Sequence, residues 1–286
     1  MDVSTQPGQN GSLTVVGPGA FTQDLQDDSY VDVGGPSSVG QLTINGATLH
    51  QSGLDMSVNV APGSTLTVEN GGALNQDEVS GDININGNLI LNNGTVSGGS
   101  FGVSIASATV TNGSLVTSQG SINFNGSVVV DDSTITSFGS VGNMDGTLTI
   151  QNGGYVEGDS IWDVTGTINV SSGRLLTISP TFQGDINLQL SSQTDGPIFG
   201  GAVTYGGALG ITLEDGFTPT LGERFLLFSF SSYAGAFNHV DLPPLPGGEA
   251  WNISQLYTTG TISVVPEPTS IGLTLAAGAL LLRRRP

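Results

Sequence analysis

Two neighbouring carboxylates and two histidines are the side chains of this chain best suited to acid–base chemistry. Asp131 and Asp132 are adjacent in mid-chain, and His50 and His239 are the only histidines. Enzymes that cleave polysaccharides need clustered carboxylates with a His, Lys or Arg to handle protons and acidic sugars. Neither histidine here belongs to a recognisable motif, Lys and Cys are absent, and no Ser-His-Asp arrangement is evident. We therefore expect no catalytic residue, no cofactor and no enzymatic activity.

A calcium site is the second chemistry to consider. Residues 153–160 are rich in glycine and carboxylates, as calcium-binding repeats are, but the segment occurs once and its spacing does not match. Five basic residues stand against 24 acidic ones, giving a formal net charge of −19. We expect diffuse attraction of cations to this surface and no specific metal site. The same charge repels phosphate backbones, which disfavours nucleic acid as a partner.

The composition indicates many short strands joined by turns. The chain has 44 glycines and only 10% charged residues, with Val, Ile and Leu spread singly among Ser, Thr, Asn and Gly. β-Branched residues fit a pleated sheet, and Gly and Asn adopt the positive φ that corners require. Disordered chains lack such regularly spaced apolar residues. Without cysteine there is no disulfide, so packing must stabilise the fold.

Glycine-containing corners recur with a period of about twenty residues, the range of solenoid repeats. One series consists of pairs that end at Gly87, Gly126, Gly146 and Gly166, separated by 39, 20 and 20 residues. The other series runs in step with it and comprises Gly94, Gly113, Ser133, Gly153 and Gly173. Short alternating strands lie between the corners, for example residues 128–130, 148–150 and 168–170.

This period predicts a coil that climbs one strand spacing, about 4.8 Å, per turn, so that each strand pairs in parallel with its equivalent one coil on. We therefore expect an all-β fold, a single-stranded parallel β-helix over residues 1–190. Its structural corners are expected at Gly94, Gly113, Gly126, Gly146, Gly153, Gly166 and Gly173.

Asn-Gly corners also match the N-glycosylation acceptor pattern at Asn10, Asn93, Asn112 and Asn125. The pattern arises automatically where such a corner leads into a Ser/Thr-rich strand. We favour this structural interpretation, and we interpret Asp131-Asp132 as a corner for the same reason.

The pattern changes after residue 190. Residues 191–264 are denser in aromatic and apolar side chains, with strands expected at 209–213, 225–230, 235–240, 251–254 and 259–264. We expect a small antiparallel cap that covers the open strand edges at the end of the solenoid. Deletion of residues 196–264 is then expected to cause aggregation.

Residues 265–286 carry the most specific motif. Pro266, Glu267 and Pro268 precede an apolar run over residues 271–282, which is followed by Arg283, Arg284 and Arg285; with the two residues before it the segment is 269–282. A segment of 14 residues is about 21 Å long as a helix, shorter than the roughly 30 Å hydrocarbon core. Arginines resist crossing the membrane and remain on the cytoplasmic side. We expect a short C-terminal apolar helix that holds the chain in the membrane transiently.

This tail resembles the PEP-CTERM sorting signal. The resemblance implies that an exosortase, a membrane cysteine transpeptidase, recognises Pro266, Glu267 and Pro268, cuts nearby, and delivers the protein to the cell surface or to extracellular polysaccharide. Arg283, Arg284 and Arg285 then act as the membrane stop that sets orientation. A simple C-terminal anchor, or an apolar helix packed on the protein, needs no Pro-Glu-Pro motif.

The coils themselves are similar to the repeats of autotransporter passengers. Together these resemblances imply an exported bacterial protein of the cell surface or extracellular matrix, structural or adhesive, associated with exopolysaccharide. The alternative is a polysaccharide lyase or hydrolase built on a β-helix. Residues 1–8 have neither a basic start nor an apolar stretch. An export signal therefore lies upstream of Met1, or has been removed, or the assignment to export is wrong.

Overall fold

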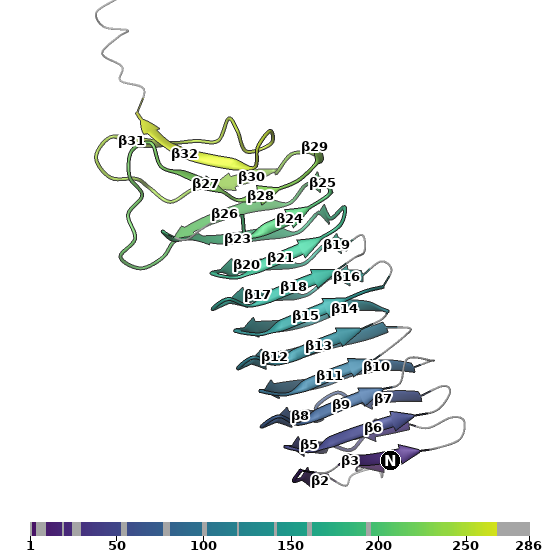
Figure 1. The fold of residues 1–286 in the computed structure, drawn as a ribbon. Coiled ribbons are helices and arrows are strands. Elements are labelled where there is room, and N and C mark those ends of the chain that lie inside the picture. Colours follow the sequence, from purple (N-terminus) through teal and green to yellow (C-terminus); the bar gives the residue numbers. More distant parts are fainter. Residues whose placement is uncertain are drawn as a thin grey trace, which may run out of the picture.

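The computed structural model describes residues 2–3, 10–18, 20–24, 30–52, 56–76, 81–98, 102–118, 120–139, 142–158, 162–192 and 196–267. Within these ranges the chain is all β, contains no helix, and winds into a parallel β-solenoid (Figure 1). The fold class predicted from the glycine period is therefore confirmed. The predicted apolar helix at 269–282, together with Pro268 and Arg283, Arg284 and Arg285, lies outside the described residues.

Each complete coil supplies a strand to three successive faces, and neighbouring coils pair in parallel. The first face contains β1 (Asp2–Val3), β4 (Tyr30–Val33), β7 (Met56–Val60), β16 (Gly142–Met144), β19 (Trp162–Val164), β22 (Thr181–Phe182), β25 (Ala202–Tyr205) and β29 (Ser232–Gly235). The second face contains β2 (Gly11–Val16), β5 (Gly40–Asn45), β8 (Thr65–Glu69), β17 (Thr147–Gln151), β20 (Thr167–Ser171), β23 (Asp185–Leu190), β26 (Ala208–Leu213) and β30 (His239–Asp241).

Three longer strands run across both of these faces and change register between them: β10 (Gly81–Asn92), β12 (Gly102–Thr111) and β14 (Ser121–Asp131). The third face contains β3 (Ala20–Asp24), β6 (Thr48–Ser52), β9 (Ala73–Gln76), β11 (Thr95–Gly98), β13 (Leu115–Ser118), β15 (Thr134–Ser137), β18 (Tyr155–Gly158), β21 (Arg174–Thr177), β24 (Ile198–Gly200) and β28 (Phe228–Ser229). The sequence period indicated two strand series, and the structure adds a third.

The core consists of apolar columns that run along the solenoid. Alternation along each strand sends every second side chain inward, and parallel pairing stacks it on its equivalent one coil away. On the second face one such column is fully buried: Leu42, Leu66, Leu89, Ala108, Val128, Leu148, Ile168, Ile186 and Leu209. Each face supplies columns of this kind, so every coil adds the same layer of buried side chains.

The corner between the first and second faces is a column of glycines. The strand register places Gly126, Gly146 and Gly166 directly above one another, as their spacing predicts. A Cβ at Gly166 would overlap the carbonyl oxygen of Gly146, and that oxygen also accepts a hydrogen bond from the amide of Thr167 at 2.9 Å. Only glycine lets consecutive coils approach this closely.

At the corner between the second and third faces, the predicted alignment of Gly94, Gly113, Gly153 and Gly173 in one column is wrong. The strand register stacks Gly94 and Gly173 on Gly72, Ser114, Ser133 and Gly154. Gly113 and Gly153 lie one residue earlier, with φ of +72° and +84°. Two-residue and three-residue corners alternate along this edge, and the extra glycine donates its amide to the next coil: Gly113 to Asp132 at 2.7 Å and Gly153 to Ser172 at 2.5 Å. Spacing alone hid this one-residue offset, because total coil length hardly changes.

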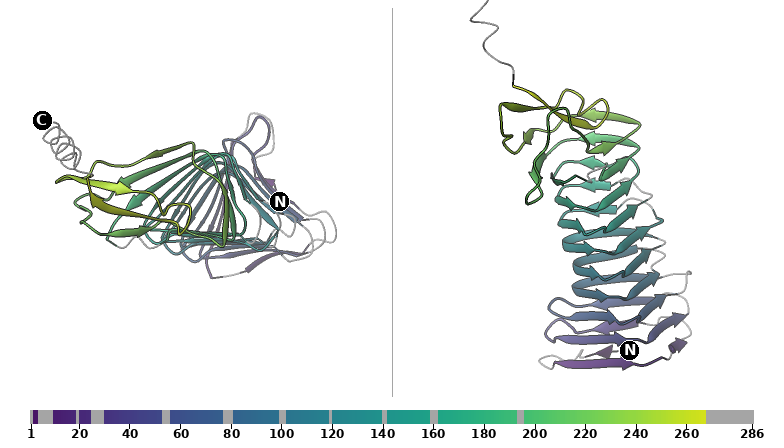
Figure 2. Two further views of the ribbon diagram at one scale, coloured as in Figure 1. Left: turned by 90° about the horizontal axis from the view of Figure 1, so that it is seen from above. Right: turned by 60° about the vertical axis from the view of Figure 1, so that its left-hand side comes forward.

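The C-terminal region differs from the expected cap in extent. Parallel pairing continues beyond Leu190, since β26 pairs with β23 and β30 pairs with β26. Residues 209–213, expected in an antiparallel unit, are therefore part of the solenoid. The antiparallel cap exists as a three-stranded sheet of β27 (Arg224–Leu226), β31 (Glu249–Asn252) and β32 (Thr261–Pro266), here called the cap sheet. It lies at the end of the rod opposite the N-terminus (Figures 1 and 2).

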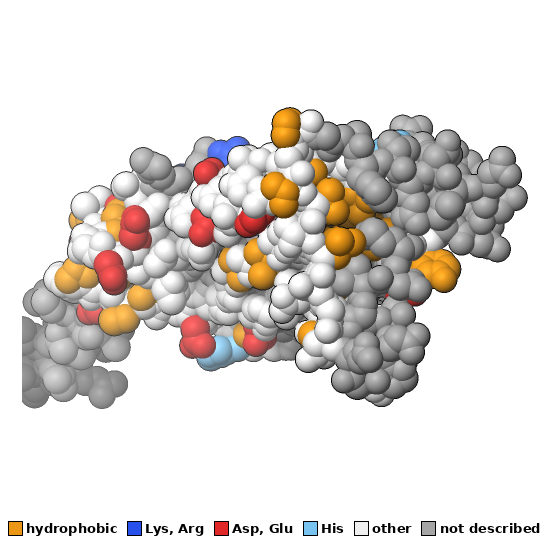
Figure 3. Space-filling view, turned by 90° about the horizontal axis from the view of Figure 1, so that it is seen from below, with side chains coloured by type: hydrophobic (Ala, Val, Ile, Leu, Met, Phe, Trp, Pro, Cys, Tyr) orange, Lys and Arg blue, Asp and Glu red, His pale blue; other side chains and the backbone are white. Residues whose placement is uncertain are grey.

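The two ends of the rod differ in how their last strands are covered. At the first coil β2 pairs only with β5 among the described strands, and Leu13, in line with the core residue Leu42, is 37% exposed. Hydrophobic side chains are visible in the view of this end, among scattered acidic ones (Figure 3). Beneath the cap sheet, by contrast, aromatic rings fill the last coils.

Tyr205 lies at the centre of this aromatic cluster. Its ring centroid is 4.9 Å from that of Phe237, 5.4 Å from Phe228 and 5.5 Å from Tyr257. The residue is 4% exposed, and its buried hydroxyl has no hydrogen-bond partner. Burial raises the pKa of this phenol. A buried hydroxyl without a partner costs free energy that the rest of the aromatic packing must offset.

Substitution Tyr205→Phe is expected to leave stability unchanged or to raise it by about 1 kcal/mol, because it removes the unpaired hydroxyl and keeps the ring. The raised pKa adds a pH signature. Stability that depends on the neutral phenol is present below about pH 10 and is lost as pH rises further, since the unfolded phenol ionises first. Denaturant unfolding at pH 7 and pH 10.5 should therefore show a smaller alkaline loss in the variant. A clear loss of stability at pH 7 would contradict the assignment.

Candidate functional site

The outer surface of the second face is a regular polar array. Three ladders of outward side chains run along it, spaced about 4.8 Å between coils and about 6.8 Å along each strand. The central ladder comprises Thr43, Thr67, Ile90, Thr109, Val129, Thr149, Asn169 and Asn187. Its amides bond along the rod, from Asn187 Nδ2 to Asn169 Oδ1 at 2.9 Å. This array, here called the second-face ladders, presents mainly hydroxyls and amides, with Ile90 and Val129 as the apolar members of its central ladder.

Asp131 belongs to a ladder beside the central one and not to a catalytic pair. Its two carboxylate oxygens accept hydrogen bonds from Gln151 at 2.9 Å and from Asn152 at 2.8 Å. Both bonds lower the pKa of Asp131, and the bond from Gln151 has the larger effect. Asp132 is the corner residue, with φ of +46°. A carboxyl with a lowered pKa is a poor general acid at neutral pH. The predicted corner is therefore correct for Asp132 alone, because Asp131 is the last residue of β14 and pairs with Gln151 in β17.

The Asp131 bonds can be tested by titration. We expect an NMR titration to give Asp131 a pKa below the usual value for aspartate. Substitution Gln151→Leu should raise that pKa more than Asn152→Ala does, because the Gln151 bond contributes most. A pKa that neither substitution changes would show that solvent, and not the ladder, sets the charge of this group.

The structure does not bring the two histidines together. His50 lies in β6 near the first coils, whereas His239 begins β30 at the capped end (Figure 1). His239 Nε2 is 2.7 Å from Asp241 Oδ1, but both side chains are exposed. The described residues contain no group of three or more metal-ligating side chains positioned to hold an ion.

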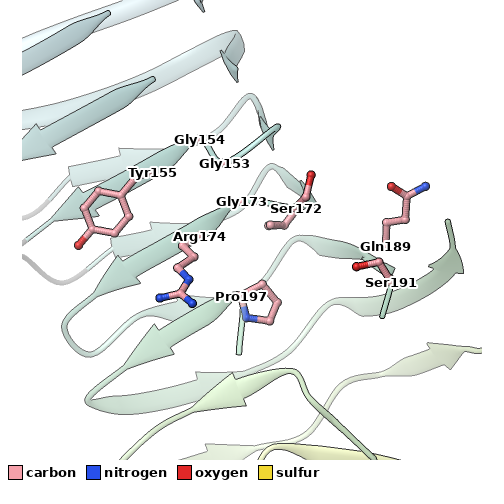
Figure 4. Close-up of a pocket in the computed structure, with 10 residues that line it drawn as sticks. Gly153, Gly154, Tyr155, Ser172, Gly173, Arg174, Gln189, Ser191 and Pro197 are labelled. Atoms are coloured by element: carbon pink, nitrogen blue, oxygen red, sulfur yellow. The ribbon is translucent and has the colours of Figure 1, made fainter. Parts of the chain in front are cut away.

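A pocket of about 200 Å³ opens beside the corner between the second and third faces. It spans three successive coils, because Tyr155 in β18, Arg174 in β21 and Pro197 stack in one column of the third face. Gln189, Ser172 and Ser191 form the opposite wall (Figure 4), and glycines at the corner leave the space open. We call this the Arg174 pocket.

Arg174 is exposed and held by an aromatic ring. Its guanidinium carbon lies 5.7 Å from the centroid of Phe199, in a cation–π arrangement. No described residue gives it an ion pair or a hydrogen bond. Tyr155 beside it is half-buried; burial raises the pKa of its phenol, the carboxylate of Glu157 raises it further, and Arg174 opposes the shift. At neutral pH the pocket therefore presents the neutral phenol of Tyr155 and the positively charged guanidinium of Arg174, whose N–H donors have no protein acceptor among the described residues.

The only other basic residue in the described ranges, Arg224, lies at a second hollow. One face of the cap sheet, with the loop between β31 and β32, forms a groove of about 760 Å³. Its described lining is Arg224, Leu226, Asn252, Ser254, Gln255, Thr259, Thr261 and Ser263. No carboxylate is among these residues. We call this the Arg224 groove.

The start of the expected sorting motif is attached to the cap sheet. Pro266 ends β32 opposite Glu249, and the amide of Glu267 donates to the carbonyl of Gly248 at 2.9 Å. The side chains of Pro266 and Glu267 are exposed. No helix in the described part of the chain is long and apolar enough to cross a membrane.

No protein-family model, no curated protein and no solved structure matches this chain. The candidate sites therefore stand on the geometry described above. Sequence reasoning did not find the Arg174 pocket. The available signal was that Tyr155 and Arg174 are one coil apart in a chain with very few cations.

Proposed function

We propose that this protein is a non-enzymatic scaffold or adhesin, exported by a bacterium to its surface or extracellular matrix and associated with exopolysaccharide there. The sorting step is assigned to an exosortase-type membrane peptidase that reads Pro266, Glu267 and Pro268. The segment 269–282 and the three arginines after it then hold the chain in the membrane until it is cut. The rod that remains is the functional part.

The observation that carries the proposal is the second-face ladders. A polysaccharide presents repeated hydroxyls, and a rod whose outer face repeats hydroxyls and amides every 4.8 Å can meet many of them at once. Single contacts of this kind are weak, but linked contacts raise the effective affinity by mass action. Polar ladders bonded to one another also lose little side-chain entropy on binding. What supports sorting is the order of motif, apolar run and arginines at the end of the sequence.

Cosedimentation with exopolysaccharide from producing cells tests the scaffold role. Replacing Thr67, Thr109 and Thr149 by Val keeps their shape and removes three hydroxyls from the second-face ladders. The matched control replaces Thr48, Thr95 and Thr134 by Val in one outward column of the third face. We expect at least a several-fold drop in bound protein for the first set only. Equal binding of both sets would reject these ladders as the binding surface, and release of shortened sugar products would favour the lyase or hydrolase alternative.

Mass spectrometry of the C-terminus, in cells with and without the sorting peptidase, tests processing. We expect the mature protein to end near Glu267 in the first cells and to retain Arg283, Arg284 and Arg285 in the second. Substituting Glu267 by Ala should produce the retained form in both. An intact tail in all of these cells would reject the sorting step and leave the scaffold role to the cosedimentation result.

A further inference from the structure

Both basic residues of the described chain are placed where a ligand could reach them. The chain carries 24 acidic residues, yet neither Arg174 nor Arg224 forms an ion pair with a described carboxylate. In so acidic a protein, a structural arginine would be expected to pair with one of its many acidic neighbours. These two instead line the Arg174 pocket and the Arg224 groove, and no described carboxylate lines either hollow.

The Arg174 pocket is the better defined of the two. The guanidinium of Arg174 lies over the ring of Phe199. Its N–H donors point outward from the edge of the guanidinium plane and remain available to a ligand. The phenol of Tyr155 stands one coil away on the same side, and Gln189 lies at the far edge of the opening (Figure 4). A volume of about 200 Å³ lies below the roughly 300–1,000 Å³ of sites that enclose a drug-sized molecule. It suits one small unit of a longer ligand.

We propose that the Arg174 pocket binds a single carboxylated sugar unit, a uronic acid, within an otherwise neutral polysaccharide. The guanidinium edge of Arg174 donates two parallel hydrogen bonds to the carboxylate, the geometry that arginine provides and lysine does not. Tyr155 supplies an apolar ring surface and a hydroxyl oxygen that can accept a hydrogen bond, since its proton is donated to Glu157, and Gln189 bonds a ring hydroxyl. The choice of a sugar as ligand rests on the proposed association with polysaccharide, whereas the carboxylate follows from the pocket alone.

Electrostatics limits the ligand to isolated acid groups. The Glu157 carboxylate lies close enough to Tyr155 to raise its pKa, and the chain as a whole carries −19. A polymer with an acid on every sugar would gain one contact at Arg174 and meet repulsion along the rest of the rod. A neutral polymer would leave the arginine donors bound only to water. A sparsely acidic polysaccharide satisfies both conditions.

The test uses two oligosaccharides that differ by one acid. Aldotetraouronic acid, a xylotriose carrying one methylglucuronate, is titrated into the whole protein by calorimetry or NMR, and xylotetraose serves as the neutral match. We expect the acidic ligand to bind at least tenfold more tightly, with NMR shifts centred on Tyr155, Arg174 and Gln189. Substitution Arg174→Gln should abolish that preference, and Arg174→Lys should restore only part of it, since Lys keeps the charge and loses the fork.

Arg224→Gln is the matched control, because it removes the same charge from another exposed site. We expect its affinity for the acidic ligand to stay within twofold of the parent. Equal losses in Arg174→Gln and Arg224→Gln would show a general effect of net charge and overturn the assignment to the pocket. Absence of any preference for the acidic ligand would overturn it as well. Neither result affects the cosedimentation experiment, which depends on the second-face ladders. The proposed scaffold role is therefore tested independently of the Arg174 pocket.

Discussion

Substitution Gly166→Ala is expected to destabilise the solenoid by about 3 kcal/mol, the upper range for inserting atoms into packed structure. The new Cβ would overlap the Gly146 carbonyl oxygen and lie 2.7 Å from the carbonyl carbon of Asp145. Neither atom can move aside freely. The Gly146 carbonyl is bonded to the next coil, and the glycine column fixes the distance between coils on both sides.

Two other glycines separate this steric cost from ordinary effects of glycine replacement. At Gly201 a Cβ would find its nearest neighbour at 3.8 Å, so Gly201→Ala is expected to change stability by less than about 0.5 kcal/mol. At Gly113 there is open space but φ is +72°, so Gly113→Ala is expected to cost about 1 kcal/mol from backbone strain alone. In denaturant unfolding, Gly166→Ala should lose the most stability, Gly113→Ala less, and Gly201→Ala the least. A loss in Gly166→Ala no larger than that in Gly201→Ala would mean that the coils are not in close contact there.

Substitution Ile262→Asp is expected to detach the cap sheet and make the protein associate. Ile262 is 1% exposed, pairs with Phe225 in β27, and faces the core of the last coils. A carboxylate there has no partner and would cost several kcal/mol to bury, more than the small cap sheet can offset. Once the cap sheet opens, the aromatic cluster around Tyr205 and the last parallel strands become available to other molecules.

The adjacent residue provides the control. Ser263 points to the opposite face of β32, where it lies across from Arg224 in the Arg224 groove. Ser263→Asp adds the same charge in solvent and next to a cation, so we expect it to remain monomeric and close to the parent in stability. Sedimentation velocity over a range of concentrations distinguishes the two variants. A monomeric Ile262→Asp protein would show that the cap sheet does not protect the end of the solenoid.

The repeat explains why so much of this fold could be predicted. In a solenoid each coil contacts only its neighbours, so one period in the sequence determines every pairing along the rod. Gly126, Gly146 and Gly166 stack as their spacing requires because that corner has constant length. Gly113 and Gly153 do not stack with Gly94, because every second corner contains an extra left-handed glycine. One added residue changes the coil length too little to show in the sequence period.

The parts that could not be predicted depend on contacts between coils or between unlike elements. Residues 209–213 look the same in sequence whether they pair in parallel with β23 or antiparallel with a cap strand, since alternation defines a strand and not its partner. The Arg174 pocket arises where Tyr155, Arg174 and Gln189 come from three coils. Its residues meet only when the register at the alternating corners is known.

The position of β32 determines how the rod would stand if its last residues were held at a membrane. The first described coil and the end of β32 lie at opposite extremes of the stack, so a tether through Glu267 leaves the first coil farthest from the bilayer. Inserting or deleting one coil would then change the height of that distal end by about 4.8 Å without altering either extremity. The reach of such a molecule would therefore scale with its number of coils, while the faces along its length stayed unchanged.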